Sequence, residues 1–206
     1  MLIYITDINK FYNEKEFIEN IYSASINGVK YIQLRYKNSL NIDKEKISKI
    51  IAQKIDRTDT KIIINEDIEI SKKIKPFGFH ISSQNNISGK EIKQLTNVKW
   101  VSKSVHNEDD IYESNMDKNI DSYILGTLFK SNSHPEGNYL GIDNFKKLIK
   151  LSSKPVIAIG GIDENNVGLV HKSGASGIAV ISSIAYSKNI NKTIDQLENK
   201  NDKYNP

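Results

Sequence analysis

The stretch KPVIAIGGIDENNVGLVHKSGASGIAVISSI, residues 154–184, decides the fold because it holds two apolar strands that run directly into small residues. Residues 155–159 form a continuous apolar run, which is typical of a parallel strand buried on both faces. Gly160-Gly161 ends this run, and Ser182-Ser183 ends the second one, residues 178–181. Paired glycines let the backbone turn sharply and approach a ligand, and helix starts suit anions. We therefore expect a phosphate between the two turns, although two ordinary βα turns would read similarly.

Upstream of residue 154 the chain repeats the same alternation of strand and helix. Strands are predicted at residues 2–6, 31–34, 62–64, 78–81, 99–101 and 123–125. Helices are predicted at residues 14–26, 42–55, 88–95, 109–116 and 143–151, with a short helix after the third strand that ends at residue 74. Eight alternations predict an α/β fold, a closed (β/α)8 TIM barrel in a single domain over residues 1–198. The competing fold is a doubly wound open sheet, which usually has fewer strands and carries its phosphate glycines after the first strand. Residues 199–206 are polar and are expected to form a flexible tail.

Composition excludes several classes of protein. The 206 residues contain no cysteine, so disulfides, thiolate metal sites and cysteine nucleophiles are excluded. The net charge of +4 is spread along the chain, which argues against nucleic acid as a partner. No segment approaches the roughly 20 apolar residues of a membrane span, so we expect no membrane partner and a cytoplasmic location. A homo-oligomer remains possible.

Polar residues that follow the predicted strands are the candidates for chemistry, because the active site of such a barrel lies at the carboxyl ends of its strands. The set is rich in cations and phosphate donors, and it lacks a dense carboxylate or histidine cluster with metal-ligand spacing. Its members are Gln33, Arg35, Lys37, Asn65, Glu66, Asp67, His80, Ser82, Gln84, Ser104, His106, Thr127, Ser131, Ser133, His134, Gly160, Gly161, Ser182 and Ser183.

Seven segments carry a resemblance to a known family. IQLRYK, NED, FHISSQN, KSVH, GTLFKSNSHPEG, KPVIAIGGI and GIAVISSI occur in the order typical of the thiamine phosphate synthase and thiazole tautomerase (TenI) superfamily, which the chain resembles over nearly its whole length. The resemblance implies a barrel of thiamine biosynthesis that binds a phosphorylated thiazole. The substrate- and phosphate-binding residues that it implies are Gln33, Arg35, Lys37, Asn65, Ser104, Thr127, Gly160, Gly161, Ile181, Ser182 and Ser183.

The synthase branch is similar only in part. Its pattern holds Mg²⁺ with an Asp after Asn at the third strand and a second Asp beyond the fourth strand, where this chain has Glu66 and Asn85. Its Thr-x-Thr-Lys motif, which grips a diphosphate, reads SNSH here and ends in His134. Losing one carboxylate and displacing the other should weaken a Mg²⁺ site, which leaves Glu66 and Asp67 as weak metal candidates.

These departures favour the tautomerase branch, which aromatises a carboxythiazole phosphate by moving one proton. Such a shift needs no metal or other cofactor and suits a histidine. We assign the catalytic role to His134, with His106 in support, although some relatives carry the catalytic histidine at the position of Thr127. The sequence therefore predicts a thiazole tautomerase. The alternatives are a Mg²⁺-dependent thiamine phosphate synthase and a catalytically inactive barrel that binds a thiazole or thiamine phosphate and acts in regulation.

Overall fold

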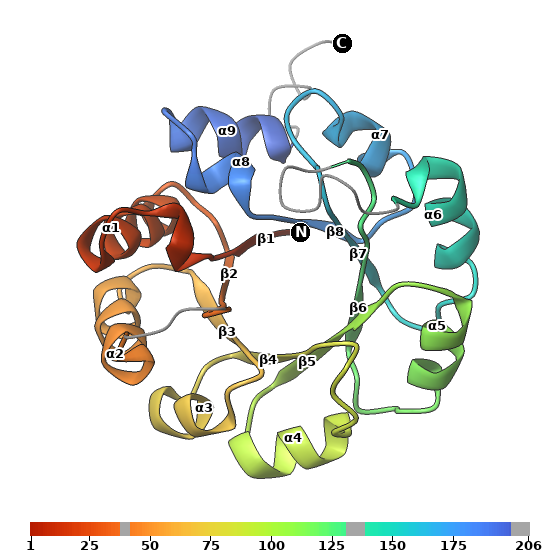
Figure 1. The fold of residues 1–206 in the computed structure, drawn as a ribbon, viewed down its shortest axis with the longest axis horizontal. Coiled ribbons are helices and arrows are strands. Elements are labelled where there is room, and N and C mark those ends of the chain that lie inside the picture. Colours follow the sequence, from red (N-terminus) through yellow and green to blue (C-terminus); the bar gives the residue numbers. More distant parts are fainter. Residues whose placement is uncertain (38–41, 131–138, 199–206) are drawn as a thin grey trace.

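The architecture is a closed barrel of parallel strands in chain order, with β8 paired back to β1 (Figure 1). The computed structural model describes residues 1–37, 42–130 and 139–198. The strands are β1 (Leu2–Ile5), β2 (Tyr31–Leu34), β3 (Lys61–Asn65), β4 (Gly78–Ile81), β5 (Trp100–Val105), β6 (Ser122–Leu125), β7 (Val156–Ile159) and β8 (Gly177–Val180). The predicted (β/α)8 fold is confirmed.

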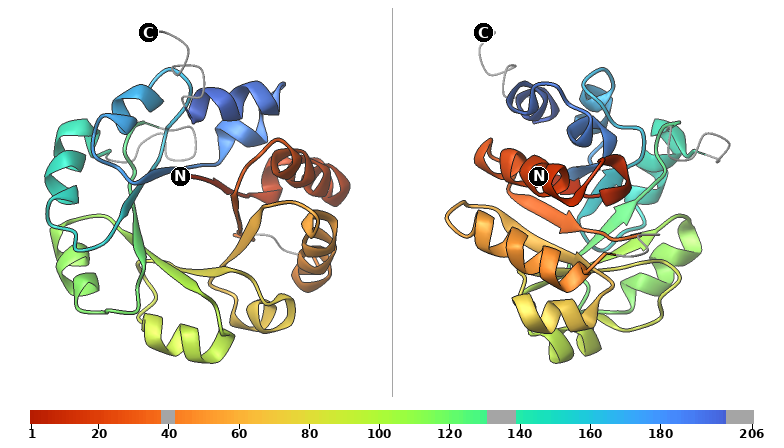
Figure 2. Two further views of the ribbon diagram at one scale, coloured as in Figure 1. Left: turned by 180° about the vertical axis from the view of Figure 1, so that it is seen from behind. Right: turned by 60° about the vertical axis from the view of Figure 1, so that its left-hand side comes forward.

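Helices surround the strands on the outside of the barrel, as both views of Figure 2 show. They are α1 (Glu14–Ile26), α2 (Lys44–Ile55), α3 (Ile68–Ile74), α4 (Gly89–Thr96), α5 (Glu108–Asn115), α6 (Gly141–Ile149), α7 (Val167–His171), α8 (Ser182–Ala185) and α9 (Ile190–Leu197), with a 3₁₀ turn, η1 (Ile8–Lys10). Within the described ranges none of them combines the length and the apolar character that crossing a bilayer requires.

The core has two layers, which explains why the strands are apolar without alternation. The barrel interior is filled by the small and branched side chains of Ile3, Ile5, Ile63, Ile124, Ile157 and Ala179. Trp100 and Tyr31 pack against this group. A larger layer, including Phe17, Phe79 and Phe145, lies between strands and helices. A strand residue is therefore buried whichever way it points.

Three details differ from the pattern expected from sequence. Strand β5 runs to Val105 rather than ending at Val101, because its Ser-Lys-Ser segment pairs with both β4 and β6. The residues DENN, 163–166, read in the sequence as the capped start of a helix, but α7 begins only at Val167. Asp163 Oδ1 accepts hydrogen bonds from the backbone amides of Asn165 and Asn166 in a turn that precedes the helix. Helix α9 was not predicted at all, and it buries Ile194 and Leu197.

Candidate active site

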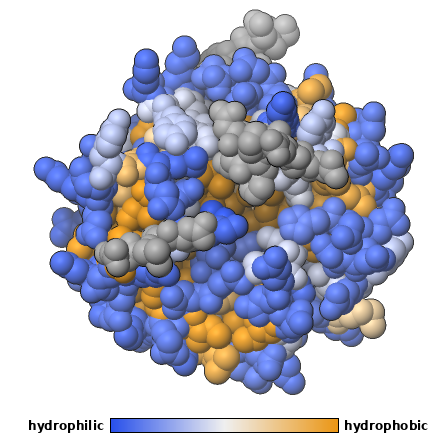
Figure 3. Space-filling view, viewed as in Figure 1, coloured by the Kyte–Doolittle hydropathy of each residue, from blue (hydrophilic) through white to orange (hydrophobic). Residues whose placement is uncertain are grey.

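The carboxyl ends of the strands surround a cavity of about 1060 Å³. Figure 3 views the molecule as in Figure 1, and hydrophobic residues show there between hydrophilic ones. Every binding residue expected from the sequence lines this cavity, namely Gln33, Arg35, Lys37, Asn65, Ser104, Thr127, Gly160, Gly161, Ile181, Ser182 and Ser183. His106, Glu66 and Asp67 line it as well, whereas His134 lies outside the described residues. The fold thus gathers into one site residues as far apart in the sequence as Gln33 and Ser183.

The turn after β7 requires its two glycines. Gly160 and Gly161 have φ of 105° and 63°, in the left-handed region that side chains rarely adopt. A Cβ on Gly161 would lie 2.4 Å from the carbonyl oxygen of Lys130, because the chain after β6 runs alongside, with Phe129 N donating to Gly160 O at 3.0 Å. The turn therefore brings bare backbone to the cavity.

The turn after β8 contributes hydroxyl and amide groups beside these glycines. Ser183 Oγ donates to the carbonyl oxygen of Ile162 at 2.6 Å, so its hydrogen is not available to a ligand. The Ser182 hydroxyl makes no hydrogen bond within the described ranges, and the first amides of a helix have no intrahelical partner. Ser182 and these amides are therefore the groups that can donate to a ligand here.

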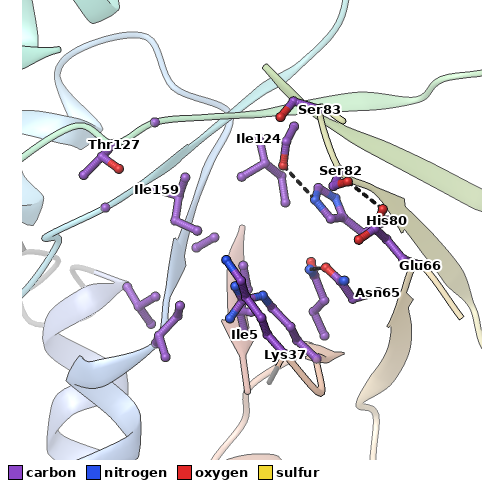
Figure 4. Close-up of a pocket in the computed structure, with 18 of the residues that line it drawn as sticks. Ile5, Lys37, Asn65, Glu66, His80, Ser82, Ser83, Ile124, Thr127 and Ile159 are labelled. Carbon is purple, nitrogen blue, oxygen red and sulfur yellow. Dashed lines mark hydrogen bonds between the residues drawn. The ribbon is translucent and has the colours of Figure 1, made fainter. Parts of the chain in front are cut away.

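Cations also line the cavity. Arg35 and Lys37 follow β2, where Arg35 N donates to Thr6 Oγ1 and Lys37 O accepts from Asn9 Nδ2. Their side chains form no ion pair with another described residue, and the Lys37 side chain reaches into the pocket in Figure 4. Lys44 and Lys130 also line the cavity and were not expected. Lys130 lies in the segment just past β6 and could have been found by its position, whereas Lys44 lies at the start of a helix.

The floor of the cavity holds a buried amide pair. Gln33 is 1 % exposed, and its Nε2 donates to Asn65 Oδ1 at 3.0 Å. Gln33 Oε1 has no hydrogen-bond partner among the described residues. An unpaired buried acceptor is costly, so this oxygen is suited to accept a hydrogen bond from a ligand.

His80 lines the cavity between two serines. Its Nδ1 lies 2.8 Å from Ser102 Oγ and its Nε2 lies 2.9 Å from Ser104 Oγ. Burial, with a smaller contribution from the nearby Arg35 charge, lowers the pKa of His80 to about 3. The ring is therefore neutral near pH 7 and orients the Ser104 hydroxyl at the cavity surface.

His106 is exposed at the rim, and its tautomer follows from its partners. Its Nδ1 lies 2.7 Å from the carbonyl oxygen of Gly126, and its Nε2 lies 3.2 Å from Ser83 Oγ. A carbonyl oxygen only accepts, so Nδ1 carries the hydrogen and Nε2 of the neutral ring is an acceptor. Ser83 is the donor to Nε2. The contacts with Gly126 and Ser83 thus fix the orientation of the His106 ring at the rim.

The two metal candidates already have partners. Glu66 Oε1 accepts from Ser82 Oγ at 2.5 Å and from Asn85 Nδ2 at 3.4 Å, and Figure 4 shows Glu66 beside Ser82 on the wall facing Thr127 and Ile159. Asp67 accepts from Ile70 N and caps α3. Across the described part of the chain, no group of three or more His, Asp or Glu residues is arranged to hold a metal ion. One oxygen of each carboxylate, Glu66 Oε1 and Asp67 Oδ1, already accepts hydrogen bonds from the protein, so this donor set is weaker for Mg²⁺ than two carboxylates free of protein partners.

Comparison with known proteins places the chain in a family. Residues 2–184 match the family model described as thiamine monophosphate synthase. The thiamine-phosphate synthase of Methanococcus vannielii is 30 % identical over 188 residues, covering 88 % of this chain and 89 % of that protein. That of Staphylococcus haemolyticus is 29 % identical over 189 residues, covering 89 % and 88 %. The solved thiamine phosphate pyrophosphorylase of Pyrococcus furiosus has the same fold, with a TM-score of 0.81 at 21 % identity over 98 % of this chain and 95 % of that one. The chain belongs to the thiamine monophosphate synthase family, a family of thiamine biosynthesis.

Proposed function

We propose that this protein is a thiamine phosphate synthase, which joins a pyrimidine diphosphate to a thiazole phosphate. Relatives that match nearly the full length of the chain carry this name, and none of those named above is called a tautomerase. The relatives therefore support the synthase over the tautomerase that the sequence motifs alone favoured.

The observation that carries the proposal is a single cavity lined by two separate sets of groups whose chemistry suits an anion. Backbone amides and Ser182 at the β7 and β8 turns form one set, and the side chains of Arg35 and Lys37 form the other. One phosphorylated substrate can be held by each set, with their reacting atoms between. Holding two reactants in this way makes the reaction effectively unimolecular.

In the proposed reaction a C–N bond to the thiazole nitrogen forms as the C–O bond to diphosphate breaks. Arg35 and Lys37 are placed to stabilise the negative charge that grows on the leaving diphosphate. Gln33 Oε1 and Ser104 Oγ are placed to orient a substrate ring through hydrogen bonds. No carboxylate-held metal enters this description, because Glu66 Oε1 and Asp67 Oδ1 already accept hydrogen bonds from the protein.

The activity is tested by incubation with both substrates and detection of thiamine phosphate and released diphosphate. Ser182→Asp supplies a matched variant, because a carboxylate in the first turn of α8 suits the helix but repels a phosphate. We expect this variant to raise the KM for thiazole phosphate at least tenfold with the Tm unchanged. An unchanged KM for thiazole phosphate in Ser182→Asp would show that the phosphate does not bind at this part of the cavity.

A thiazole tautomerase is the second candidate. It is favoured by the Glu66 carboxylate, whose Oε1 already accepts two hydrogen bonds from the protein, and by His134, which stands where the synthase pattern has a diphosphate-binding lysine. A proton shift needs a base near neutrality and no metal. His134→Asn should then lower kcat for tautomerisation by roughly 10² with little change in KM. His106→Asn should have a smaller effect.

Two assays separate the candidates. Thiamine phosphate formation without solvent proton exchange into the carboxythiazole phosphate supports the synthase, and the reverse supports the tautomerase. Tight binding of thiazole phosphate with neither activity would instead identify a regulatory binding protein.

A further inference from the structure

The loop after β4 places the amide of Asn85 beside the Glu66 carboxylate. The Glu66 carboxylate faces the cavity and accepts hydrogen bonds from Ser82 and Asn85 through the same oxygen, Oε1. Two donors on one carboxylate oxygen satisfy part of the charge that a divalent ion would otherwise neutralise.

The orientation of the Asn85 amide is set by a second contact. Asn85 Oδ1 accepts from the backbone amide of Ile87 at 3.0 Å. A backbone N–H can only donate, so the oxygen of Asn85 must face Ile87 and its NH₂ group must face Glu66. Asn85 therefore presents hydrogens, not a lone pair, to the space in front of Glu66.

We propose that Asn85 keeps this pocket free of a carboxylate-held divalent cation, and that the chain's own cations meet the charge of a diphosphate ligand instead. Four basic residues line the cavity for this purpose, Arg35, Lys37, Lys44 and Lys130. The identity of the ligand rests on the proposed function. The statement about the metal rests on the contacts of Glu66 and Asn85.

Asn85→Asp isolates the deciding position, because it exchanges the NH₂ group for an oxygen of nearly the same size and keeps the oxygen that accepts from Ile87. The new carboxylate oxygen would face Glu66 at about the present 3.4 Å separation. Two carboxylates at this distance repel each other, and Mg²⁺ is bound in proteins by one or two carboxylates completed by water. The variant should therefore create a Mg²⁺ site where the natural chain lacks one.

The first experiment measures Tm with and without about 10 mM MgCl₂, using NaCl to match ionic strength. We expect Asn85→Asp to melt below the natural chain without Mg²⁺ and to gain roughly 3 °C or more when it is added. The natural chain and Asn86→Asp should not respond. Asn86 is the exposed next residue and makes no hydrogen bond to Glu66 within the described ranges, so this control makes the same charge change away from that carboxylate. A Mg²⁺ response of the natural chain, or none in folded Asn85→Asp, would overturn the proposal.

A second experiment does not depend on the folding of Asn85→Asp. Calorimetric titration of inorganic pyrophosphate into the natural chain should give a Kd that Mg²⁺ does not improve. Glu66→Gln, which keeps an oxygen to accept from Ser82 and Asn85, should bind pyrophosphate in Mg²⁺ as tightly as the natural chain or tighter. A tenfold gain in affinity on adding Mg²⁺, lost in Glu66→Gln, would show that Glu66 holds a metal.

Neither experiment contains a thiazole or a pyrimidine. A failed synthase assay therefore leaves the metal result standing, and a Mg²⁺-dependent natural chain would leave the synthase proposal standing with a conventional metal site.

Discussion

At the scale of single residues, His80 shows how the barrel uses a buried polar group. Its two ring nitrogens are both satisfied by serines of β5, and one of these serines, Ser104, faces the cavity. A neutral histidine has one donor and one acceptor nitrogen, so it fixes a complementary direction of hydrogen bonding on Ser102 and Ser104. Burial makes this arrangement depend on the ring staying uncharged.

Stability should therefore fall in mild acid. The folded-state pKa of His80, about 3, lies below the roughly 6.5 of an unfolded chain, so the unfolded state binds the additional proton between these values. The stability from neutral His80 is complete above pH 6.5 and is lost as pH falls toward 3, by at most about 1.4 kcal/mol per pH unit. Urea unfolding from pH 7 to 4.5 measures the slope.

His80→Gln supplies the comparison, since its side chain does not titrate. We expect a clearly smaller slope in this variant over the same interval, whatever its absolute stability. Equal slopes in the two proteins would mean that the ring of His80 is accessible to protons in the folded state.

At the scale of secondary structure elements, the closing helix α9 completes the outer layer. Its buried residues Ile194 and Leu197 are fully enclosed, and it packs against α1 and α8. His171 Nε2 of α7 lies 2.9 Å from the carbonyl oxygen of Leu197, and since a carbonyl only accepts, the ring donates to the end of the helix. Helix α9 thus ties the last helices of the barrel to the first.

Ile194→Ala should destabilise the fold by about 2–5 kcal/mol, the usual cost of a large-to-small change at a fully buried position. The exposed Lys192 lies on the same helix, and Lys192→Ala should change the free energy of unfolding by less than about 0.5 kcal/mol. Denaturant unfolding monitored by circular dichroism compares the two. Equal small effects would indicate that α9 contributes little to the barrel's stability.

At the scale of the whole molecule, the fold and the pocket use charge differently. The five ion pairs between described residues all lie on the surface, and each side chain in them is at least 29 % exposed. Exposed pairs contribute little and are screened by salt, so the barrel is stabilised mainly by its two apolar layers. The cavity instead gathers Arg35, Lys37, Lys44 and Lys130 around one space.

Raising NaCl from about 0.05 to about 0.5 M should therefore separate the two properties. We expect the Tm to shift by less than about 2 °C, while the Kd for inorganic pyrophosphate rises at least tenfold as the cavity's cations are screened. Scanning calorimetry and titration calorimetry in the same buffers measure both. A large fall in Tm would mean that surface ion pairs stabilise the barrel, and an unchanged Kd would mean that the cations do not bind the anion.

Much of this molecule could be predicted from local pattern. Strands β2 and β4 and helix α1 have the bounds expected from sequence, because apolar runs, caps and glycines act over a few residues. The predicted binding residues of the described chain line one cavity for a related reason, since the ends of parallel strands meet at one edge of any such barrel. The end of β5 and the polar helix α9 were missed, because their burial depends on distant partners such as β6 and α1.

Tertiary structure alone decided how the polar groups of the site pair with one another. The sequence placed Glu66, Ser82 and Asn85 near the cavity, but their hydrogen bonds join the segments that follow β3 and β4 and depend on the orientation of an amide held by Ile87. The tautomer of His106 likewise follows from the Gly126 carbonyl, 20 residues away. Residue type and spacing determine which groups reach the mouth of the barrel. Which of them remain free to bind a ligand is determined by partners that only the folded chain brings within hydrogen-bonding distance.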